Sequence, residues 1–420
     1  MRYTPIAADF YIQNRQILAQ KFKKNSMAVF TANTFYKSSG DGEAGFKQNS
    51  SFFYLTGIDQ EDCKLILLKT ESAYEEFLFI AETNDKIRVW EGEKLSLVQA
   101  RLLSGIKNIY HLSQFWSKIQ SLGKGLSIIY GHLDLIHAKN TEIQTVEKQF
   151  LTRLKKSFSG VKFLNPAPWV NEQRLVKDPR EIVQIQKAID ISAEAFKHLT
   201  KTLKPGLFEY QAEAELSYKM AAMGSRYPAF HTIMASGANA CVLHYIKNDK
   251  ICKEGDSVLI DFGAEYGGYN ADVSRVLPVG ASFTTRQKDV YQAVLEVLYY
   301  LKKYIKPGEL LSEIRAETRI IIGQKLQNLN LASKISDEVI LKYFPHGPCH
   351  FLGLVVHDVG DKSVKLSQNM LITCEPGIYI HEEGIGVRLE NDLLITKNGN
   401  HDLCEAIPIE INEIEKLKQQ

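Results

Sequence analysis

The 420-residue sequence has no run of eighteen apolar residues, so it predicts no membrane-spanning helix. Its first stretch, MRYTPIAADFYIQNRQ, contains no apolar segment of the kind that forms the centre of a secretory signal. The formal net charge is only +2, which excludes a strong field for nucleic acid or an anionic membrane surface. We therefore expect a cytoplasmic protein whose partners include neither nucleic acid nor membrane.

Cysteine is also scarce, and no two cysteines form a C-x-x-C pair, which argues against a zinc knuckle. Scattered cysteines are typical of a cytosolic protein with reduced thiols. We expect Cys349 and Cys374 to be buried packing residues, although each directly precedes a candidate site residue. The six cysteines are Cys63, Cys241, Cys252, Cys349, Cys374 and Cys404.

The chain is too long for one ordinary core, and a domain size of ~100–200 residues predicts two domains. Two prolines within residues 165–168 mark a boundary, so we expect domains at residues 1–165 and 171–420. In the first, the pattern predicts a helix in FYIQNRQILAQKF and strands in SMAVFTA, FFYLTG, KLILLK and EEFLFIA. In the second, Asp178 and Pro179 predict the start of a long helix.

The C-terminal part contains one pattern twice. Each copy has a helix, a Lys-Pro-Gly sequence (residues 204–206 and 306–308) and a second helix. An aromatic–proline pair, an irregular segment that ends at a histidine and a hairpin then follow in both copies. Lys-Pro-Gly helix ends are common by chance, but the shared order of features favours duplication. Two packed copies predict an α+β domain with pseudo-two-fold symmetry and hairpins that meet in its middle.

Four carboxylates lie on these two hairpins, each near apolar residues that predict burial. Buried carboxylates are rarely left without a partner. Three interpretations stay open: pairing with arginine, exposure at strand ends, or binding of hard cations. Two divalent ions would neutralise the four charges, which otherwise repel one another. The carboxylates are Asp261 in VLIDFG, Asp272 in NADVSR, Glu375 in TCEPG and Glu390 in VRLEND, and the candidate arginine partners are Arg275 and Arg388.

Three histidines, His346, His350 and His357, lie within the fifteen residues HGPCHFLGLVVHDVG. Gly347 and Pro348 separate the first two and exclude a helix interior, so the histidines do not form a pair on one helical face. If this segment binds metal, each histidine acts singly with ligands from elsewhere. A mostly oxygen shell with one imidazole favours Mn²⁺, Co²⁺, Fe²⁺ or Zn²⁺ over copper.

The motifs DFG, NADVSR, HGPCHFLGLVVHDVG, CEPGIY and VRLEND resemble the pita-bread-fold metallopeptidases, in particular the Xaa-Pro aminopeptidases (aminopeptidase P) and next the prolidases. FKQNSSFFYLTG and ASGANACVLHY extend the resemblance to nearly the whole chain, although Lys47 replaces the usual arginine. The implied fold is a C-terminal pita-bread domain with a smaller creatinase-like α/β N-terminal domain. The family's five metal ligands fall on Asp261, Asp272, His350, Glu375 and Glu390.

The resemblance also implies what these ligands do. Asp272 and Glu390 would bridge two divalent metal ions, Asp261 would bind one ion, and His350 and Glu375 would bind the other. Mn²⁺ is the favoured metal, with Co²⁺, Fe²⁺ and Zn²⁺ as alternatives. A hydroxide between the ions would be the nucleophile, and Glu375 would act as its general base.

Four further residues receive roles through the same resemblance. His244 and His357 would position the substrate and carry a proton to the leaving nitrogen, because a proline nitrogen has no hydrogen in a peptide bond. Arg388 would order the site through charged hydrogen bonds and, with Tyr379, would lie at the substrate.

Three residues are less clearly assigned. Trp90 resembles a family tryptophan that contacts the active site of a neighbouring subunit, and ordinary core packing is its alternative. We expect His231 to line the pocket, and His346 to be structural or to line the pocket. The resemblance implies a homo-oligomer, a dimer or tetramer.

The implied function is a dinuclear-metal aminopeptidase that cleaves between an N-terminal residue and a following proline in peptides. Prolidase, which takes only Xaa-Pro dipeptides, is the nearest alternative because it shares every metal ligand. Methionine aminopeptidase shares the C-terminal fold but typically lacks this N-terminal domain, so it ranks below the other two enzymes. A non-catalytic peptide-binding relative is a remote alternative, because such proteins have lost ligands that this chain retains.

Overall fold

The computed structural model describes residues 2–36, 38–40, 42–134 and 145–419. Its backbone contacts separate residues 5–174, the N-terminal unit, from residues 175–420 with 1–4, the C-terminal unit. The domains expected from the sequence, 1–165 and 171–420, differ from these units mainly in the placement of α7 (Ala167–Leu175). Among the described residues, no helix combines the length and hydropathy needed to cross a bilayer.

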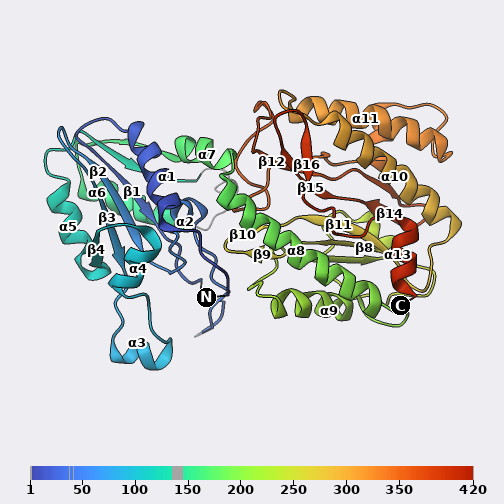
Figure 1. Cartoon of the computed structure of the whole chain (residues 1–420), viewed down its shortest axis with the longest axis horizontal. Helices are drawn as coiled ribbons and strands as arrows, with labels where there is room; N and C mark the ends of the chain where they lie inside the picture. Colours follow the sequence, from blue (N-terminus) through green and yellow to red (C-terminus); the bar gives the residue numbers. More distant parts are fainter. Residues whose placement is uncertain (1, 37, 41, 135–144, 420) are drawn as a thin grey trace. The chain divides into compact units, whose positions relative to one another are not determined.

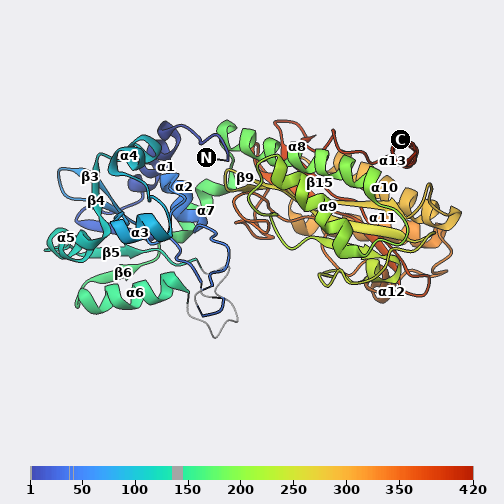
Figure 2. The ribbon, with the colours of Figure 1, turned by 90° about the horizontal axis from the view of Figure 1, so that it is seen from below.

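The N-terminal unit is built on one mixed sheet of six strands in the order β4-β3-β2-β1-β5-β6. All six residues of the central strand β1 are buried, so both of its faces are covered. Helices α5 and α6 pack on one face, and α1, α2 and α4 lie together on the other (Figure 2). The elements of this unit are α1 (Ala8–Gln20), β1 (Ser26–Thr31), α2 (Ser50–Thr56), β2 (Lys64–Lys69), β3 (Tyr74–Ile80), α3 (Asp85–Trp90), α4 (Leu97–Ser104), β4 (Asn108–His111), α5 (Phe115–Leu122), β5 (Ile128–Gly131), α6 (Val146–Ser157), β6 (Lys162–Leu164) and α7.

The strand expected in FFYLTG is wrong, because this segment forms helix α2. The Asn49 side chain accepts a hydrogen bond from the Phe52 N–H and caps the start of the helix. Gly57 ends it in the left-handed conformation with φ 68°. A short apolar run has no distinguishing period, so the residues on either side of it decide between helix and strand.

The C-terminal unit contains two helix pairs, α8–α9 and α10–α11, with strands between them in Figure 1. Asp178 caps α8 with Pro179 at its first position, as expected. The elements of this unit are α8 (Pro179–Thr202), α9 (Glu209–Ala222), β7 (Ile233–Ser236), the 3-10 helix η2 (Gly237–Cys241), β8 (Ser257–Phe262), β9 (Glu265–Tyr266), β10 (Tyr269–Asn270), β11 (Val273–Pro278), α10 (Thr285–Tyr304), α11 (Leu311–Asn328), α12 (Asp337–Tyr343), β12 (Leu371–Cys374), β13 (Gly377–Ile380), β14 (Ile385–Arg388), β15 (Asn391–Ile395), β16 (Asn400–Asp402) and α13 (Ile411–Lys418).

The two Lys-Pro-Gly sequences make the same contacts in the two halves. The Gly206 N–H donates to the Cys252 carbonyl at 2.9 Å, and the Gly308 N–H donates to the Leu366 carbonyl at 2.8 Å. Both glycines have positive φ, 89° and 96°, in the turn between two helices. Each half therefore repeats helix, turn, helix and hairpin with matching hydrogen bonds, which is the pseudo-two-fold duplication expected from the sequence.

Each hairpin consists of an outer strand pair and a short inner pair at its tip. The outer pairs are β8–β11 and β12–β15, and the inner pairs are β9–β10 and β13–β14. In the first hairpin Asp261 lies opposite Ser274. Gly267 and Gly268 turn the chain with φ 59° and 83°, and Gly384 does so in the second hairpin with φ 63°. The hairpins place the expected carboxylates at the ends of their outer strands.

Candidate metal centre and substrate pocket

The strand ends bring the predicted carboxylates to one place. Asp272 directly precedes β11 and Glu390 directly precedes β15, so the two residues occupy equivalent positions in the two halves. Asp261 lies near the end of β8, and Glu375 directly follows β12. All four line one cavity of about 310 Å³ together with His350. The five residues that sequence analysis named as ligands are therefore neighbours in the structure.

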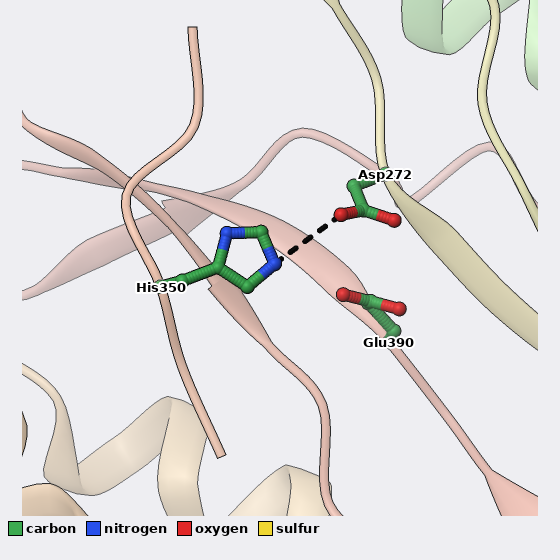
Figure 3. Close-up of side chains that lie close together, drawn as sticks. All are labelled: Asp272, His350 and Glu390. Carbon is green, nitrogen blue, oxygen red and sulfur yellow. Dashed lines mark ion pairs between the residues drawn. The ribbon is translucent and has the colours of Figure 1, made fainter. Parts of the chain in front are cut away.

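Asp272, His350 and Glu390 form the tightest cluster, with one donor atom of each within 4.8 Å of the others (Figure 3). The Nε2 atom of His350 lies 3.3 Å from an Asp272 carboxylate oxygen and 3.7 Å from Oε1 of Glu375. In Figure 3 the three side chains converge from separate segments of the chain. This donor set of one imidazole and several carboxylates is typical of sites for divalent transition metals.

His350 reaches the cluster through backbone pairing next to the irregular Gly347-Pro348 segment. The Glu375 N–H donates to the Pro348 carbonyl at 2.8 Å, and the Thr373 N–H donates to the His350 carbonyl at 2.9 Å. These bonds align the strand-like segment around His350 antiparallel to β12 and its continuation. An extended segment, and not a helix, thus presents His350 beside Glu375, as the proline predicted.

The tautomer of His350 indicates that its Nε2 atom presents a lone pair to the neighbouring carboxylates. Its Nδ1 lies 3.1 Å from the Phe351 carbonyl, which can only accept, so Nδ1 carries the hydrogen. Burial lowers the pKa of His350 and favours the neutral ring. The lone pair of Nε2 therefore faces the carboxylate oxygens of Asp272 and Glu375, and a cation between them satisfies all three groups.

The electrostatics of the carboxylates agree with a cation site. Burial raises the pKa values of Asp272, Glu375 and Glu390 well above their usual range, and the neighbouring carboxylates raise them further. One guanidinium, that of Arg388, faces four carboxylates in the cavity lining. One oxygen of Asp261, Oδ1, is buried and has no hydrogen-bond partner among the residues that the structure describes. The residues present thus fit divalent metal ions, which supply the missing positive charge.

Arg388 connects the two halves of the site. Its guanidinium donates to Asp261 at 2.6 Å, to the Ser274 hydroxyl at 2.9 Å and to the Tyr379 hydroxyl at 3.0 Å. The Ser274 hydroxyl in turn donates to Glu390 at 2.7 Å. These bonds fix the orientation of two expected ligands, Asp261 and Glu390, through one buried side chain.

Tyr379 and His346 lie behind this arginine. The His346 Nδ1 is 2.8 Å from the Gly347 carbonyl and therefore donates, so its Nε2 accepts from the Tyr379 hydroxyl at 2.8 Å. Burial, with the charge of Arg388, lowers the pKa of His346 to about 3, which keeps the ring neutral. Tyr379 is 1% exposed and is not among the residues that line the cavity, whereas His346 is.

The remaining predicted histidines line the open side of the cavity. His244, His231 and His357 have exposed side chains there. The His357 ring packs edge-on against the His350 ring with centroids 4.3 Å apart. Apolar side chains complete the wall, namely Phe230, Ile233, Leu243, Ile246 and Val356. The cavity thus combines charged side chains with apolar side chains and exposed histidines.

Sequence analysis missed three residues that support the ligands. Ser274 bonds both Arg388 and Glu390, Thr373 accepts from the His350 N–H at 3.1 Å, and Asp392 accepts from the Asp272 N–H at 3.1 Å. Each lies two residues from a predicted ligand on the same strand segment. This spacing was the available signal, because residues i and i+2 of a strand share one face.

The two cysteines beside the ligands face each other. Cys374 is buried and Cys349 is partly buried, and they lie opposite each other in the pairing that brings Glu375 beside His350. Burial raises the pKa of the Cys349 thiol well above its usual range. Cys374 is fully buried, as expected for a packing residue, whereas Cys349 is only partly buried.

A family model described as metallopeptidase family M24 matches residues 183–397, which include all five predicted ligands. The chain belongs to this family. A second model, described as the N-terminal domain of aminopeptidase P, matches residues 11–130. The M24 chain is thus a metal-dependent peptide hydrolase with a pita-bread C-terminal domain and an aminopeptidase P-type N-terminal domain.

Full-length relatives agree with this membership. The Xaa-Pro aminopeptidase of Escherichia coli is 33% identical over 98% of each chain. Human Xaa-Pro aminopeptidase 3 is 30% identical over 93% of this chain and 80% of its own. A variant of E. coli aminopeptidase P in complex with substrate has a TM-score of 0.91 at 31% identity, over 99% of each chain. A zinc-substituted form of that enzyme in complex with product has a TM-score of 0.90, also at 31% identity over 99% of each chain.

Proposed function

We propose that this M24 enzyme is an Xaa-Pro aminopeptidase, which releases the N-terminal residue of peptides whose second residue is proline. The observation that carries the proposal is the convergence of Asp261, Asp272, His350, Glu375 and Glu390 on one cavity that apolar side chains also line. The full-length relatives named Xaa-Pro aminopeptidase support the substrate class. A purely binding role requires no such set of charged ligands.

We infer that the site holds two divalent ions, with Mn²⁺ favoured by its oxygen-rich donors and Co²⁺, Fe²⁺ or Zn²⁺ as alternatives. Asp272 and Glu390, from equivalent positions of the two halves, would bridge the ions. Asp261 would bind one ion, and His350 and Glu375 would bind the other. Such ions supply a nucleophilic water at neutral pH and polarise the scissile carbonyl.

The chain's own side chains manage protons and orientation. Glu375 takes the proton of the attacking water as general base. His357 and His244, on the open side of the cavity, position the substrate and return a proton to the proline nitrogen, which has no hydrogen of its own in the peptide. Arg388 holds Asp261 and, through Ser274, Glu390. We assign Tyr379 to substrate binding through its bond to Arg388.

The cavity favours longer peptides over the dipeptides that prolidases take. A dipeptide carries a free carboxylate directly after proline, and a cation is the usual partner for such a group. Among the described residues that line the cavity, Arg388 is the one arginine or lysine, and its guanidinium already bonds Asp261, Ser274 and Tyr379. A peptide bond in place of the carboxylate requires no cation.

We further propose that the enzyme is a homo-oligomer, a dimer or tetramer. Helix α3 has no buried residue, and its Val89 and Trp90 are each 79% exposed. Adjoining apolar side chains at this exposure are found on surfaces that meet another chain. Trp90 is therefore not a core residue of the N-terminal unit, and the contact with a second copy is the interpretation that we retain.

We place the enzyme in the cytoplasm. All six cysteines are free thiols, and five of them are buried. Free thiols persist in a reducing compartment, and Cys349 and Cys374 face each other without a disulfide.

The deciding experiment measures hydrolysis by metal-stripped protein with and without added Mn²⁺. The substrates are Arg-Pro-Pro, Ala-Pro and Arg-Ala-Ala, and the control variant is Glu375→Gln. We expect Mn²⁺-dependent cleavage of Arg-Pro-Pro that the variant lacks. Cleavage of Ala-Pro alone would instead identify a prolidase. If none of the peptides is cleaved while metal is bound, the proposed substrate class is wrong.

A further inference from the structure

A buried carboxylate outside the cavity holds one of its walls. Glu209 begins α9 and is 0% exposed. Its Oε1 accepts from the Ser236 N–H at 2.7 Å and from the Asn239 amide at 2.9 Å. Its Oε2 accepts from the Tyr245 hydroxyl at 2.7 Å and from the Lys250 N–H at 3.0 Å. Four donors thus converge on one side chain, which satisfies both of its buried oxygens.

All four donors belong to residues 236–250, which we call the wall loop. This loop comprises the last residue of β7, η2 and the irregular segment after it, and it contributes Leu243, His244 and Ile246 to the cavity lining. Within the described residues, no hydrogen bond or ion pair of the His244 side chain is seen. The backbone of the wall loop therefore determines where the His244 ring stands.

A second set of hydrogen bonds ties Asn248, near the end of the loop, to the same helix. Asn248 is buried in the left-handed conformation with φ 46°. Its side chain donates to Glu213 at 2.8 Å and accepts from the Met234 N–H at 3.1 Å. Glu213 lies one turn after Glu209, so both glutamates face the loop from one side of α9. The helix thus acts as a rigid support for the loop.

We propose that Glu209 is a positioning residue for the reaction, which sets the His244 ring at the cavity through the wall loop. This inference rests on the proposed function, because it assigns His244 to the substrate. A carboxylate is required because all four partners are donors. The amide nitrogen of a glutamine would face the main-chain N–H of either Ser236 or Lys250, which can only donate, and would leave that donor unsatisfied.

The test is a double-mutant cycle on the full-length, Mn²⁺-loaded enzyme with Arg-Pro-Pro as substrate. We expect Glu209→Gln to lower kcat/KM by about 10- to 100-fold, as displacement of a substrate-positioning group does. In a His244→Ala background the same change should cost less than about 2-fold, because the group that it positions is already gone. An equal loss in both backgrounds would show a general structural role and overturn the proposal.

The experiment needs one control variant and one substitute variant. Glu215→Gln removes a carboxylate of the same helix that bonds His198 and not the wall loop, so kcat/KM should stay at the wild-type value. If Glu209→Gln fails to fold, Tyr245→Phe removes one of the four bonds and enters the same cycle. In Glu209→Gln, hydrogen exchange should speed up at the amide of Ser236 or Lys250 that faces the new amide nitrogen, and unchanged exchange at both amides contradicts the proposal.

The same experiments distinguish failure of the proposed function from failure of the role proposed for Glu209. Wild-type enzyme that does not cleave Arg-Pro-Pro refutes the proposed function, and with it the role of Glu209. Wild-type enzyme that cleaves the peptide, combined with additive effects of Glu209→Gln and His244→Ala, refutes the role of Glu209 alone. Bound Mn²⁺ should be equal in all variants, since Glu209 contacts no expected ligand.

Discussion

Asp272 and Glu390 stand at equivalent points of the two repeated halves, each as the last residue before the second outer strand of its hairpin. The two hairpins are joined there, because the Glu390 N–H donates to the Ser274 carbonyl at 3.1 Å and the Ser274 hydroxyl donates to Glu390 at 2.7 Å. Neither half alone contains the carboxylate cluster. The candidate metal centre is therefore a product of the packing of the two halves.

This relationship predicts unequal effects of ligand removal. If Asp272 and Glu390 bridge two ions, Asp272→Asn and Glu390→Gln should each weaken binding of both ions. The loss should exceed the ~10–100-fold typical of an outer partner of a metal ligand. Asp261→Asn should weaken mainly one ion. Metal content after dialysis against a fixed free Mn²⁺ concentration measures the difference.

The control for these variants is Glu254→Gln, an exposed carboxylate near the start of the same hairpin. It should bind as much Mn²⁺ as the wild type. Two ions per chain in Asp272→Asn or Glu390→Gln at the same free Mn²⁺ would rule out the bridging assignment.

Ser274 should matter for metal binding although it is not an expected ligand. Its hydroxyl joins Arg388 to Glu390, so Ser274→Ala should lower Mn²⁺ affinity by about 10- to 100-fold. The free energy of unfolding should fall by about 1 kcal/mol, the net value of a typical hydrogen bond. Calorimetric titration of metal-stripped protein measures the affinity.

Ser257 offers a matched control for this change. It is also a buried serine of the same strand pair, but its hydroxyl has no hydrogen-bond partner among the described residues. Ser257→Ala should leave Mn²⁺ affinity unchanged. Similar losses in the two serine variants would mean that the hydroxyl of Ser274 does not orient Glu390.

Glu181 should make the stability depend on pH. Burial raises its pKa from 4.5 to about 7, while the Asp178 N–H and the charge of Lys177 act in the opposite direction. The folded state therefore keeps a proton that the unfolded chain loses near its usual pKa, so stability falls as pH rises from about 4.5 to about 7. Glu181→Gln removes this effect and still accepts the capping hydrogen bond.

The measurement is the free energy of unfolding of both proteins across this pH range. Relative to wild type, Glu181→Gln should gain about 3 kcal/mol between about pH 4 and about pH 8, from a shift of about 2.5 units at 1.36 kcal/mol each. Other titrating groups are shared and cancel in the difference. A difference that does not change with pH would show that Glu181 has the same pKa in the folded and the unfolded protein.

The hairpins and their carboxylates were predictable because strand period and burial are local properties of the sequence. Asp261 stands in a nearly continuous apolar run, VLIDFG, so burial of its charge follows from its neighbours. The expectation that the two hairpins converge depended on recognition of the repeat and of the family motifs. Local pattern alone left pairing with arginine open, and the structure shows that Arg388 does pair with Asp261.

Other features were not predictable for physical reasons. FFYL is an uninterrupted run of large apolar residues, so its helix depends on the cap at Asn49 and the left-handed Gly57, which lie on either side of the run. The bonds of Glu209 connect residues 27 to 41 positions away. Such contacts have no sequence period, and only the packing of α9 on the wall loop brings them together.

Because the Trp90 side chain is exposed, its removal should affect assembly without affecting stability. A side chain that is 79% exposed contributes little to the fold, so Trp90→Ala should change the free energy of unfolding by less than about 0.5 kcal/mol. If α3 meets a second copy, the same variant should shift the protein toward monomer at micromolar concentration. Light scattering after size-exclusion chromatography measures the mass. Val183→Ala, on α8 and 59% exposed, is the control that should keep the wild-type mass. A Trp90→Ala protein with the wild-type mass would exclude α3 from the interface.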